Sequence, residues 1–211
     1  MTNQIPPNLI DKIQPIRLLI LDVDGVLTDG RIVMNDLGQE SKFFDVKDGH
    51  GLKVLVRCGI DVVWITGRKS TVVEHRARDL GVQEVHQLIW NKVQVYEEVL
   101  ERRKLTAREA AYMGDDIVDI PLLKRVGFAV AVNDAVDEAK QVADYVTRRN
   151  GGRGAGVDAG AGGHGSGVGW AGGGCGAAHS AAGGRLACDL SKLGIGHGRR
   201  GMGRASGGHF H

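Results

Sequence analysis

The sequence predicts an α/β protein with a doubly wound, Rossmann-like parallel sheet. Short apolar runs alternate with amphipathic segments, and clusters of acidic residues follow two of the apolar runs. Strands that are apolar throughout are typical of a parallel sheet covered by helices on both faces. Right-handed crossovers between such strands give the doubly wound arrangement, in which ligands bind at the carboxyl ends of the strands.

The individual elements follow from this alternation. We expect strands at 16–22, 61–66, 110–113 and 128–132, and a further short strand at 144–147. We expect helices between them, where apolar residues recur at helical spacing, at 51–57, 70–80, 92–103, 117–125 and 135–142.

Residues 28–46 interrupt the alternation. Two short β-prone runs there flank Asn35-Asp36-Leu37-Gly38, which is a signal for a β-hairpin. The hairpin takes the place of the helix expected after the first strand, and no further cap domain is predicted.

Composition favours one domain and excludes some functions. Residues 1–150 carry 21 Lys and Arg against 23 Asp and Glu, so charge gives no argument for binding nucleic acid. We find neither a signal peptide nor an apolar run of the roughly 20 residues that a membrane span needs. The cysteines, Cys58, Cys175 and Cys188, form no CxxC pair, which favours a reducing cytoplasm.

The C-terminal part has a different character. Residues 151–211 contain 23 of the 33 glycines, and ordering glycine is entropically costly. We therefore divide the chain into a domain at 1–155 and a disordered, atypical tail at 156–211. The abrupt change suggests the hypothesis that the reading frame shifts after Ala155. The rival hypothesis is a genuine extension that binds metal through its five histidines, but their spacing is irregular.

Two acids, Asp22 and Asp24, follow the first predicted strand. Residues two apart in a strand point to the same side, so both carboxylates can face one point at the sheet edge. Like charges repel unless a cation lies between them, which indicates a hard divalent ion such as Mg²⁺. Gly25 permits the sharp turn that follows.

A second acidic cluster, Asp115, Asp116 and Asp119, follows the strand at 110–113. One acid there would be explained as a helix N-cap. Capping does not explain three carboxylates in five residues together with the pair at 22 and 24.

Two further pieces complete a site for phosphoryl transfer. Thr66 ends the strand at 61–66, and Gly67 and Arg68 follow it; together they offer a hydroxyl, backbone N–H groups and a guanidinium to a phosphate. Lys92 begins a helix, where a cation is unfavourable unless it reaches an anion. Taken alone, Arg68 and Lys92 are better explained as surface side chains. Together with the acids they fit a carboxylate nucleophile assisted by a metal.

The motifs DVDGVLTDG, ITGR, Lys92 and GDDIVD resemble those of the haloacid dehalogenase superfamily of aspartate-dependent phosphatases. The hairpin, its end FFDVKDGHG, the missing cap and the run DYVTRRNGGRGA resemble its capless 3-deoxy-D-manno-octulosonate 8-phosphate phosphatases. This resemblance covers residues 10–155. It implies a Mg²⁺-dependent phosphatase of lipopolysaccharide precursor synthesis that acts through an aspartyl-phosphate.

The resemblance also implies a role for each site residue. Asp22 would be the nucleophile and Asp24 the general acid and then base. Thr66 and Gly67 would hold the phosphate, with Lys92 pairing to it and to Asp22. The metal would bind the Asp22 carboxylate, the Asp24 carbonyl and Asp115. Asp116 and Asp119 would orient metal-bound water. Beyond the phosphate, the sugar acid would be recognised by Lys47, Arg68 and Arg153.

Members of this family are homotetramers whose hairpins pack together, which the resemblance also implies here. The chain departs from the family at Leu88, where a glycine is usual, and after Ala155. Two other functions remain open: a phosphatase for nine-carbon sialic-type sugar acid 9-phosphates, and a non-catalytic oligomerisation module of the same fold.

Overall fold

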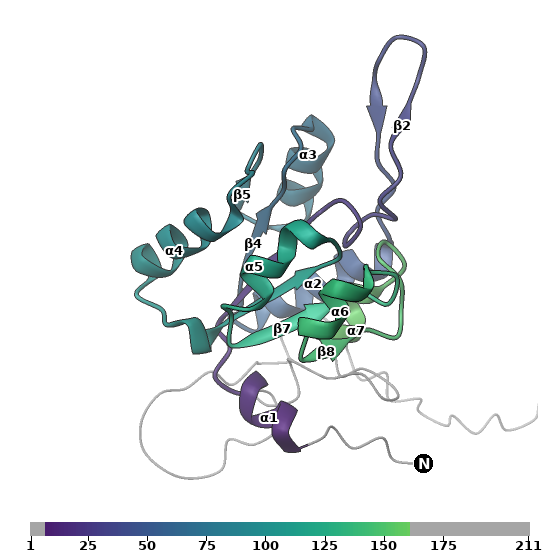
Figure 1. Cartoon of the computed structure of the whole chain (residues 1–211). Coiled ribbons are helices and arrows are strands. Elements are labelled where there is room, and N and C mark those ends of the chain that lie inside the picture. Colours follow the sequence, from purple (N-terminus) through teal and green to yellow (C-terminus); the bar gives the residue numbers. More distant parts are fainter. Residues whose placement is uncertain (1–6, 161–211) are drawn as a thin grey trace, which may run out of the picture.

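A computed structural model describes residues 7–160 of the chain. Its centre is a six-stranded parallel sheet in the order β5-β4-β1-β6-β7-β8 (Figure 1). The predicted doubly wound fold is therefore confirmed. The strands are β1 (Leu18–Leu21), β4 (Asp61–Ile65), β5 (Glu84–His86), β6 (Ala110–Gly114), β7 (Phe128–Ala131) and β8 (Tyr145–Val146).

Helices cover the sheet on both faces, as Figure 1 shows. One face carries α2 (Val46–Arg57) and α3 (Thr71–Leu80), with α7 (Ala155–Gly160) packed against α2. The opposite face carries α4 (Lys92–Arg103), α5 (Ile120–Leu123) and α6 (Asp137–Val142). Helix α1 (Pro7–Ile13) precedes the first strand. No helix within residues 7–160 is long and apolar enough to cross a membrane.

The core is built around β1, whose four residues are fully buried between β4 and β6. Burying an aliphatic side chain contributes about 1.5–3 kcal/mol, and the central position of β1 gives it apolar neighbours on both faces. This packing makes the carboxyl end of β1 a rigid base for the residues that follow.

Two predicted helices need correction, and a strand and a helix were not predicted. Helix α2 begins at Val46 rather than at 51, because the side chain of Asp45 caps it by accepting the N–H of Lys47. The helix predicted at 117–125 is a 3₁₀ turn, Ile117–Asp119, followed by α5. Strand β5 and helix α1 were not predicted.

The predicted hairpin is confirmed and projects well beyond the sheet (Figure 1). Its strands are β2 (Val33–Met34) and β3 (Glu40–Ser41). The Asn35 side chain closes the turn by accepting the N–H groups of Leu37 and Gln39. Gly38 has φ +73°, a conformation that glycine adopts without strain.

Helix α7 continues past the predicted end of the domain at 155. Its first turn is fixed by Asp48 of α2, which accepts the N–H groups of Gly154 and Gly156. Residues 161–211, which make up most of the predicted tail, lie outside the described residues. The expectations of disorder and of a frameshift therefore stay hypotheses.

Candidate active site

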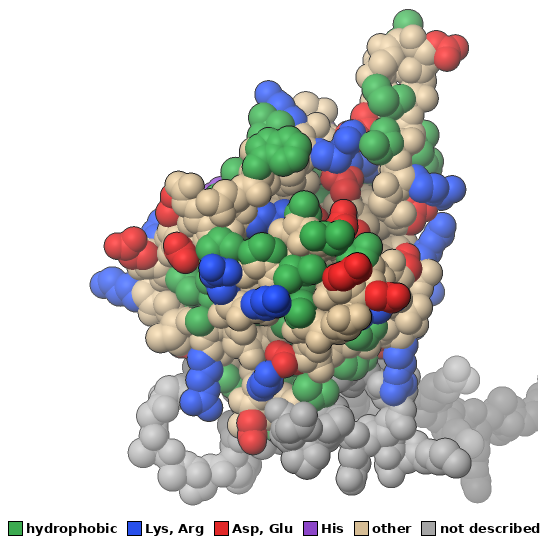
Figure 2. Space-filling view, viewed as in Figure 1, with side chains coloured by type: hydrophobic (Ala, Val, Ile, Leu, Met, Phe, Trp, Pro, Cys, Tyr) green, Lys and Arg blue, Asp and Glu red, His purple; other side chains and the backbone are tan. Residues whose placement is uncertain are grey.

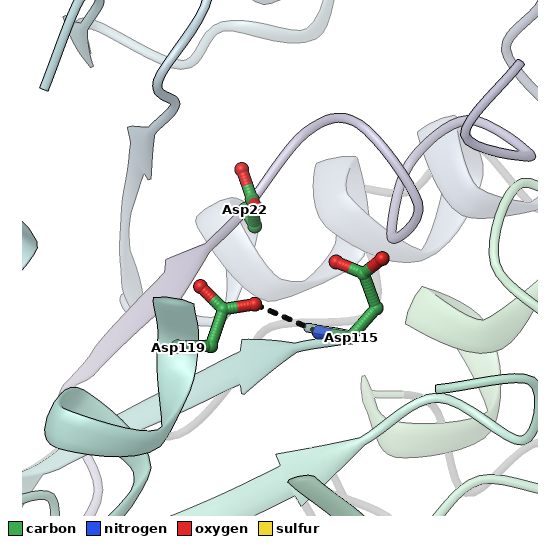
Figure 3. A group of neighbouring side chains, drawn as sticks. All are labelled: Asp22, Asp115 and Asp119. Atoms are coloured by element: carbon green, nitrogen blue, oxygen red, sulfur yellow. Dashed lines mark hydrogen bonds between the residues drawn. The ribbon is translucent and has the colours of Figure 1, made fainter. Parts of the chain in front are cut away.

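Asp22 and Asp115 are brought together by the pairing of β1 with β6. The register places Leu21 beside Met113, and the Asp22 N–H donates to the Met113 carbonyl at 3.0 Å. Because parallel strands end at the same edge of the sheet, the residues after each strand meet there. Figure 3 shows the carboxyl groups of Asp22, Asp115 and Asp119 directed toward a shared space. Oxygen atoms of the three lie within 4.8 Å of one another.

Lys92 links two of these acids. Its ammonium lies 2.7 Å from Asp22 Oδ2 and 2.7 Å from Asp119 Oδ1, and its side chain is 5% exposed. Burial opposes the charge, but the carboxylates of Asp22 and Asp119 outweigh it and raise the pKa of Lys92 above its ordinary value. The lysine is therefore charged at neutral pH and reaches the acids as the sequence predicted.

Both carboxylate oxygens of Asp119 accept hydrogen bonds from other groups of the protein. Its Oδ1 accepts from Lys92 and from the Tyr112 hydroxyl, which lies 2.6 Å away. Its Oδ2 accepts the backbone N–H groups of Asp115 and Asp116 at 2.9 and 3.1 Å. The side chain thus fixes Lys92 and the turn after β6, and its predicted part in orienting metal-bound water stays a prediction.

Asp22 and Asp115 are short of compensating charge. Burial raises the pKa of Asp22 to about 6, although Lys92 opposes the shift. Burial, followed by the charges of Asp22 and Asp119, raises the pKa of Asp115 to about 8. The buried Asp115 Oδ1 has no hydrogen-bond partner among the described residues.

A divalent cation fits this donor set. Oxygen ligands with a net negative charge are what Mg²⁺ prefers, and an orphaned buried carboxylate oxygen is costly without a partner. Asp22 and Asp115 are the carboxylates suited to hold the ion, because both oxygens of Asp119 are already used.

Gly25 leaves room for Asp115. A Cβ atom on Gly25 would lie 1.9 Å from Asp115 Oδ2, and Gly25 has φ +95°. The loop after β1 is also packed from the other side, because a Cβ on Gly151 would lie 1.6 Å from the Gly25 carbonyl oxygen. No side chain is possible at either position without moving the site.

The predicted phosphate-binding residues lie beside Asp24. Thr66 is buried at the end of β4, and its hydroxyl lies 3.4 Å from Asp24 Oδ2. The Thr66 hydroxyl also accepts the N–H of Arg68 at 3.3 Å. The Arg68 guanidinium is directed toward the hairpin, where it donates to Glu40 at 2.7 Å.

The remaining predicted residues lie farther out. Asp116 is exposed and caps the 3₁₀ turn after β6. Lys47 and Arg153 line a surface cavity of about 550 Å³ at the base of the hairpin, together with Arg31. The guanidinium of Arg153 lies 3.5 Å from Asp29. Asp29 and Asp45 also line this cavity, so its three basic groups are partly compensated.

Sequence reasoning missed three residues that contact the site: Tyr112, Glu40 and Lys42. Tyr112 stands out only as the single hydroxyl-bearing residue in the small apolar strand β6. Lys42 ion-pairs with Asp24, and Glu40 with Lys42 and Arg68. No sequence signal identifies the last two, because their contacts depend on how the hairpin folds back.

Comparison with known proteins agrees with this geometry. A family model described as haloacid dehalogenase-like hydrolase matches residues 80–156. The 3-deoxy-D-manno-octulosonate 8-phosphate phosphatase of Salmonella typhimurium is 44% identical over 151 residues, which cover 72% of this chain and 80% of that protein.

Solved structures give the same result. The crystal structure of 3-deoxy-D-manno-octulosonate 8-phosphate phosphatase from Moraxella catarrhalis, in complex with magnesium, phosphate and the sugar acid, is 36% identical with a TM-score of 0.70, covering 72% of this chain and 87% of that one. The cobalt-bound enzyme of Haemophilus influenzae is 37% identical with a TM-score of 0.66, covering 68% and 84%.

Proposed function

Because this chain belongs to the haloacid dehalogenase-like phosphatases, we propose that it hydrolyses 3-deoxy-D-manno-octulosonate 8-phosphate to the free sugar acid and phosphate. The observation that carries the proposal is the contact of Lys92 with Asp22, next to Asp115 at the sheet edge. We infer the substrate from the names of the similar phosphatases. The reaction belongs to the synthesis of lipopolysaccharide precursors, and we place it in the cytoplasm.

In this proposal Asp22 is the nucleophile, and an aspartyl-phosphate forms on its carboxylate. Lys92 holds Asp22 in place and offsets the charge of the phosphate. Thr66 and the Gly67 amide bind phosphate oxygens, while Asp24 gives a proton to the leaving sugar and then takes one from water. Removing an aligned general acid or base typically costs 10²–10⁴-fold in rate.

Mg²⁺ is the proposed cofactor. The Asp22 and Asp115 carboxylates and the Asp24 carbonyl would hold it, and when bound it would offset negative charge on the transferring phosphoryl group. Asp116, exposed nearby, is the group we propose to contact water around the ion.

A panel of phosphate esters tests the function. The purified protein is assayed with Mg²⁺ on eight-carbon and nine-carbon sugar acid phosphates and on hexose phosphates, and we expect the largest kcat/KM for the eight-carbon ester. If a nine-carbon ester had the largest kcat/KM, the proposed substrate would change and the proposed phosphatase chemistry would stand. Best turnover of hexose phosphates would end the sugar-acid assignment.

Two variants separate the enzyme from a non-catalytic module. Asp22→Asn should abolish phosphate release, whereas Asp137→Asn, on an aspartate whose side chain is 88% exposed, should leave it unchanged. Equal phosphate release from the wild type and Asp22→Asn would favour the module.

We also propose that the chain forms a homotetramer through its hairpin. Hydrophobic side chains stand exposed along this projecting element, as Figure 2 shows, and a monomer seldom leaves such a row uncovered. They are Ile32, Val33, Met34, Leu37 and Phe43. Light scattering should give four times the chain mass for the wild type and a lower mass for Met34→Glu. A monomeric wild type would refute the assembly.

A further inference from the structure

Lys42, directly after strand β3, is turned inward although the hairpin around it is exposed. The Lys42 side chain is 3% exposed, although the residue as a whole is half-buried and its neighbour Phe43 is exposed. Lysine is rarely buried to this degree unless its charge is paired. The pairing groups are Asp24 Oδ1, which the ammonium contacts, and Glu40 Oε1, 3.3 Å away.

The two oxygens of Asp24 therefore have different surroundings. Oδ1 is held by the Lys42 ammonium, and Oδ2 lies 3.4 Å from the Thr66 hydroxyl. Thr66 is at the carboxyl end of β4, so Oδ2 is the oxygen on the side where phosphate would bind. A partial rotation about the χ2 torsion would turn the carboxylate plane so that neither oxygen faced that side, and the ion pair with Lys42 opposes such a rotation.

We propose that Lys42 is a positioning residue, which holds Asp24 by Oδ1 so that Oδ2 exchanges protons with the leaving group and with water. The proposal rests on the proposed phosphatase mechanism and adds to it a residue outside the four motifs. It also gives the hairpin a part in the chemistry, since Lys42 reaches the site from that element.

The proton and bond changes balance as follows. In the first half-reaction the bond from phosphorus to the leaving oxygen breaks, a bond from phosphorus to the Asp22 carboxylate forms, and Asp24 Oδ2 gives its proton to the leaving oxygen. In the second, water oxygen bonds to phosphorus, the Asp22–phosphorus bond breaks, and Oδ2 takes the water proton. Lys42 keeps its protons throughout.

Glu40 holds Lys42 from the hairpin side. It lies 3.3 Å from the Lys42 ammonium and 2.7 Å from the Arg68 guanidinium. Two carboxyl groups and two cations thus alternate from Asp24 to Arg68. Losing Lys42 leaves Asp24 and Glu40 facing each other without the cation between them.

The test measures how strongly the rate depends on the leaving group. p-Nitrophenolate is a weak base that leaves without receiving a proton. Phenolate is a stronger base, and its departure depends more on receiving one. The values of kcat/KM on the two aryl phosphates therefore separate proton donation from phosphate binding. We expect Lys42→Met to lower kcat/KM on phenyl phosphate by ~10- to 100-fold and on p-nitrophenyl phosphate by less than about threefold. Lys42→Arg should restore much of the selectivity.

The control is Lys53→Met, which removes an ammonium on α2 that lies 3.8 Å from Asp79; it should leave both rates unchanged. Glu40→Gln weakens the hold on Lys42 without removing it and should give a smaller change in the same direction, which serves if Lys42→Met does not fold. Equal losses on both esters, or none, in folded Lys42→Met or in Glu40→Gln would overturn the role of Lys42. A wild type that releases phosphate neither from these esters nor from the sugar acid phosphates would instead overturn the proposed function.

Discussion

Lys92 begins helix α4, where the helix dipole makes a positive charge unfavourable. Its contacts with Asp22 and Asp119 compensate for that position. The sequence predicted that Lys92 would reach an anion only when it was read together with the acidic clusters and the phosphate-binding motif. It did not predict Tyr112 or the four hydrogen bonds of Asp119, since these depend on side-chain directions that only the packed fold determines.

Leu88 offers a prediction at this scale. It has φ +60° and is 56% exposed, and a left-handed conformation costs a residue with a Cβ atom roughly 1–2 kcal/mol. Replacing Leu88 by glycine removes this strain, but part of the gain is offset because a chain with glycine at this position has a more flexible unfolded state. Leu88→Gly should therefore raise the free energy of unfolding by about 0.5–1 kcal/mol, measured by urea denaturation.

Gln83→Gly is the matched control. Gln83 is exposed but lies outside the left-handed region, so glycine there should lower stability slightly. If Leu88→Gly and Gln83→Gly both destabilised the protein, strain at Leu88 would not be the explanation.

At the scale of elements, the strands and helices with a strong pattern were predicted closely. The bounds of α4 agree with prediction because its apolar spacing and cap are clear. Strand β5 was missed because it has three half-buried residues, two of them the polar Glu84 and His86. Glu84 is paired with Arg102 and Arg103, which are distant in sequence, so no local pattern reveals these contacts.

Glu84 leads to a pH prediction. Burial opposes its charge, but hydrogen bonds from His86, Arg103 and Arg102 prevail and hold the pKa of Glu84 below its ordinary value of 4.5. Such a group stabilises the fold above its unfolded pKa, and this stability is lost as pH falls through the lower folded pKa. Glu84→Gln should cost about 0.5–1 kcal/mol at pH 7.

Comparing the wild type with Glu84→Gln at several pH values tests this prediction. Thermal unfolding of the wild type and Glu84→Gln should converge as the pH is lowered from 6 toward 3. A gap in Tm that stayed constant over this range would show that packing, rather than charge, accounts for the loss.

Asp48 fastens helix α7 to α2. Its side chain is buried and accepts from Gly154 and Gly156 at 3.0 and 2.7 Å. Asp48→Ala leaves these amides without their acceptor, which should cost about 1–3 kcal/mol. Hydrogen exchange at both glycine amides should accelerate. Asp45→Ala removes a cap of α2 instead and should leave their exchange unchanged; equal exchange in both variants would contradict the clamp.

For the molecule as a whole, the site is also a weak point of the fold, because Asp115 and Asp22 are buried with incomplete compensation. Mg²⁺ at 100 times its Kd should stabilise the folded state by about 2.7 kcal/mol. This corresponds to a rise in Tm of roughly 5–10 °C for a domain of this size.

Asp115→Asn should remove most of that rise, whereas Asp137→Asn should keep it. An undiminished rise in Asp115→Asn would place the ion elsewhere. Scanning calorimetry with and without the metal decides between these outcomes without any assay of activity.

The packing of Gly151 against Gly25 has a consequence for the order in which the protein is made. A ribosome delivers Asp22 early, yet both neighbours of β1 in the sheet and the segment that backs its loop come later. The catalytic edge can therefore be completed only once synthesis has passed residue 151. A change of reading frame after Ala155 would leave that last contact intact, so such a chain would still assemble its proposed nucleophile while differing in everything translated afterwards.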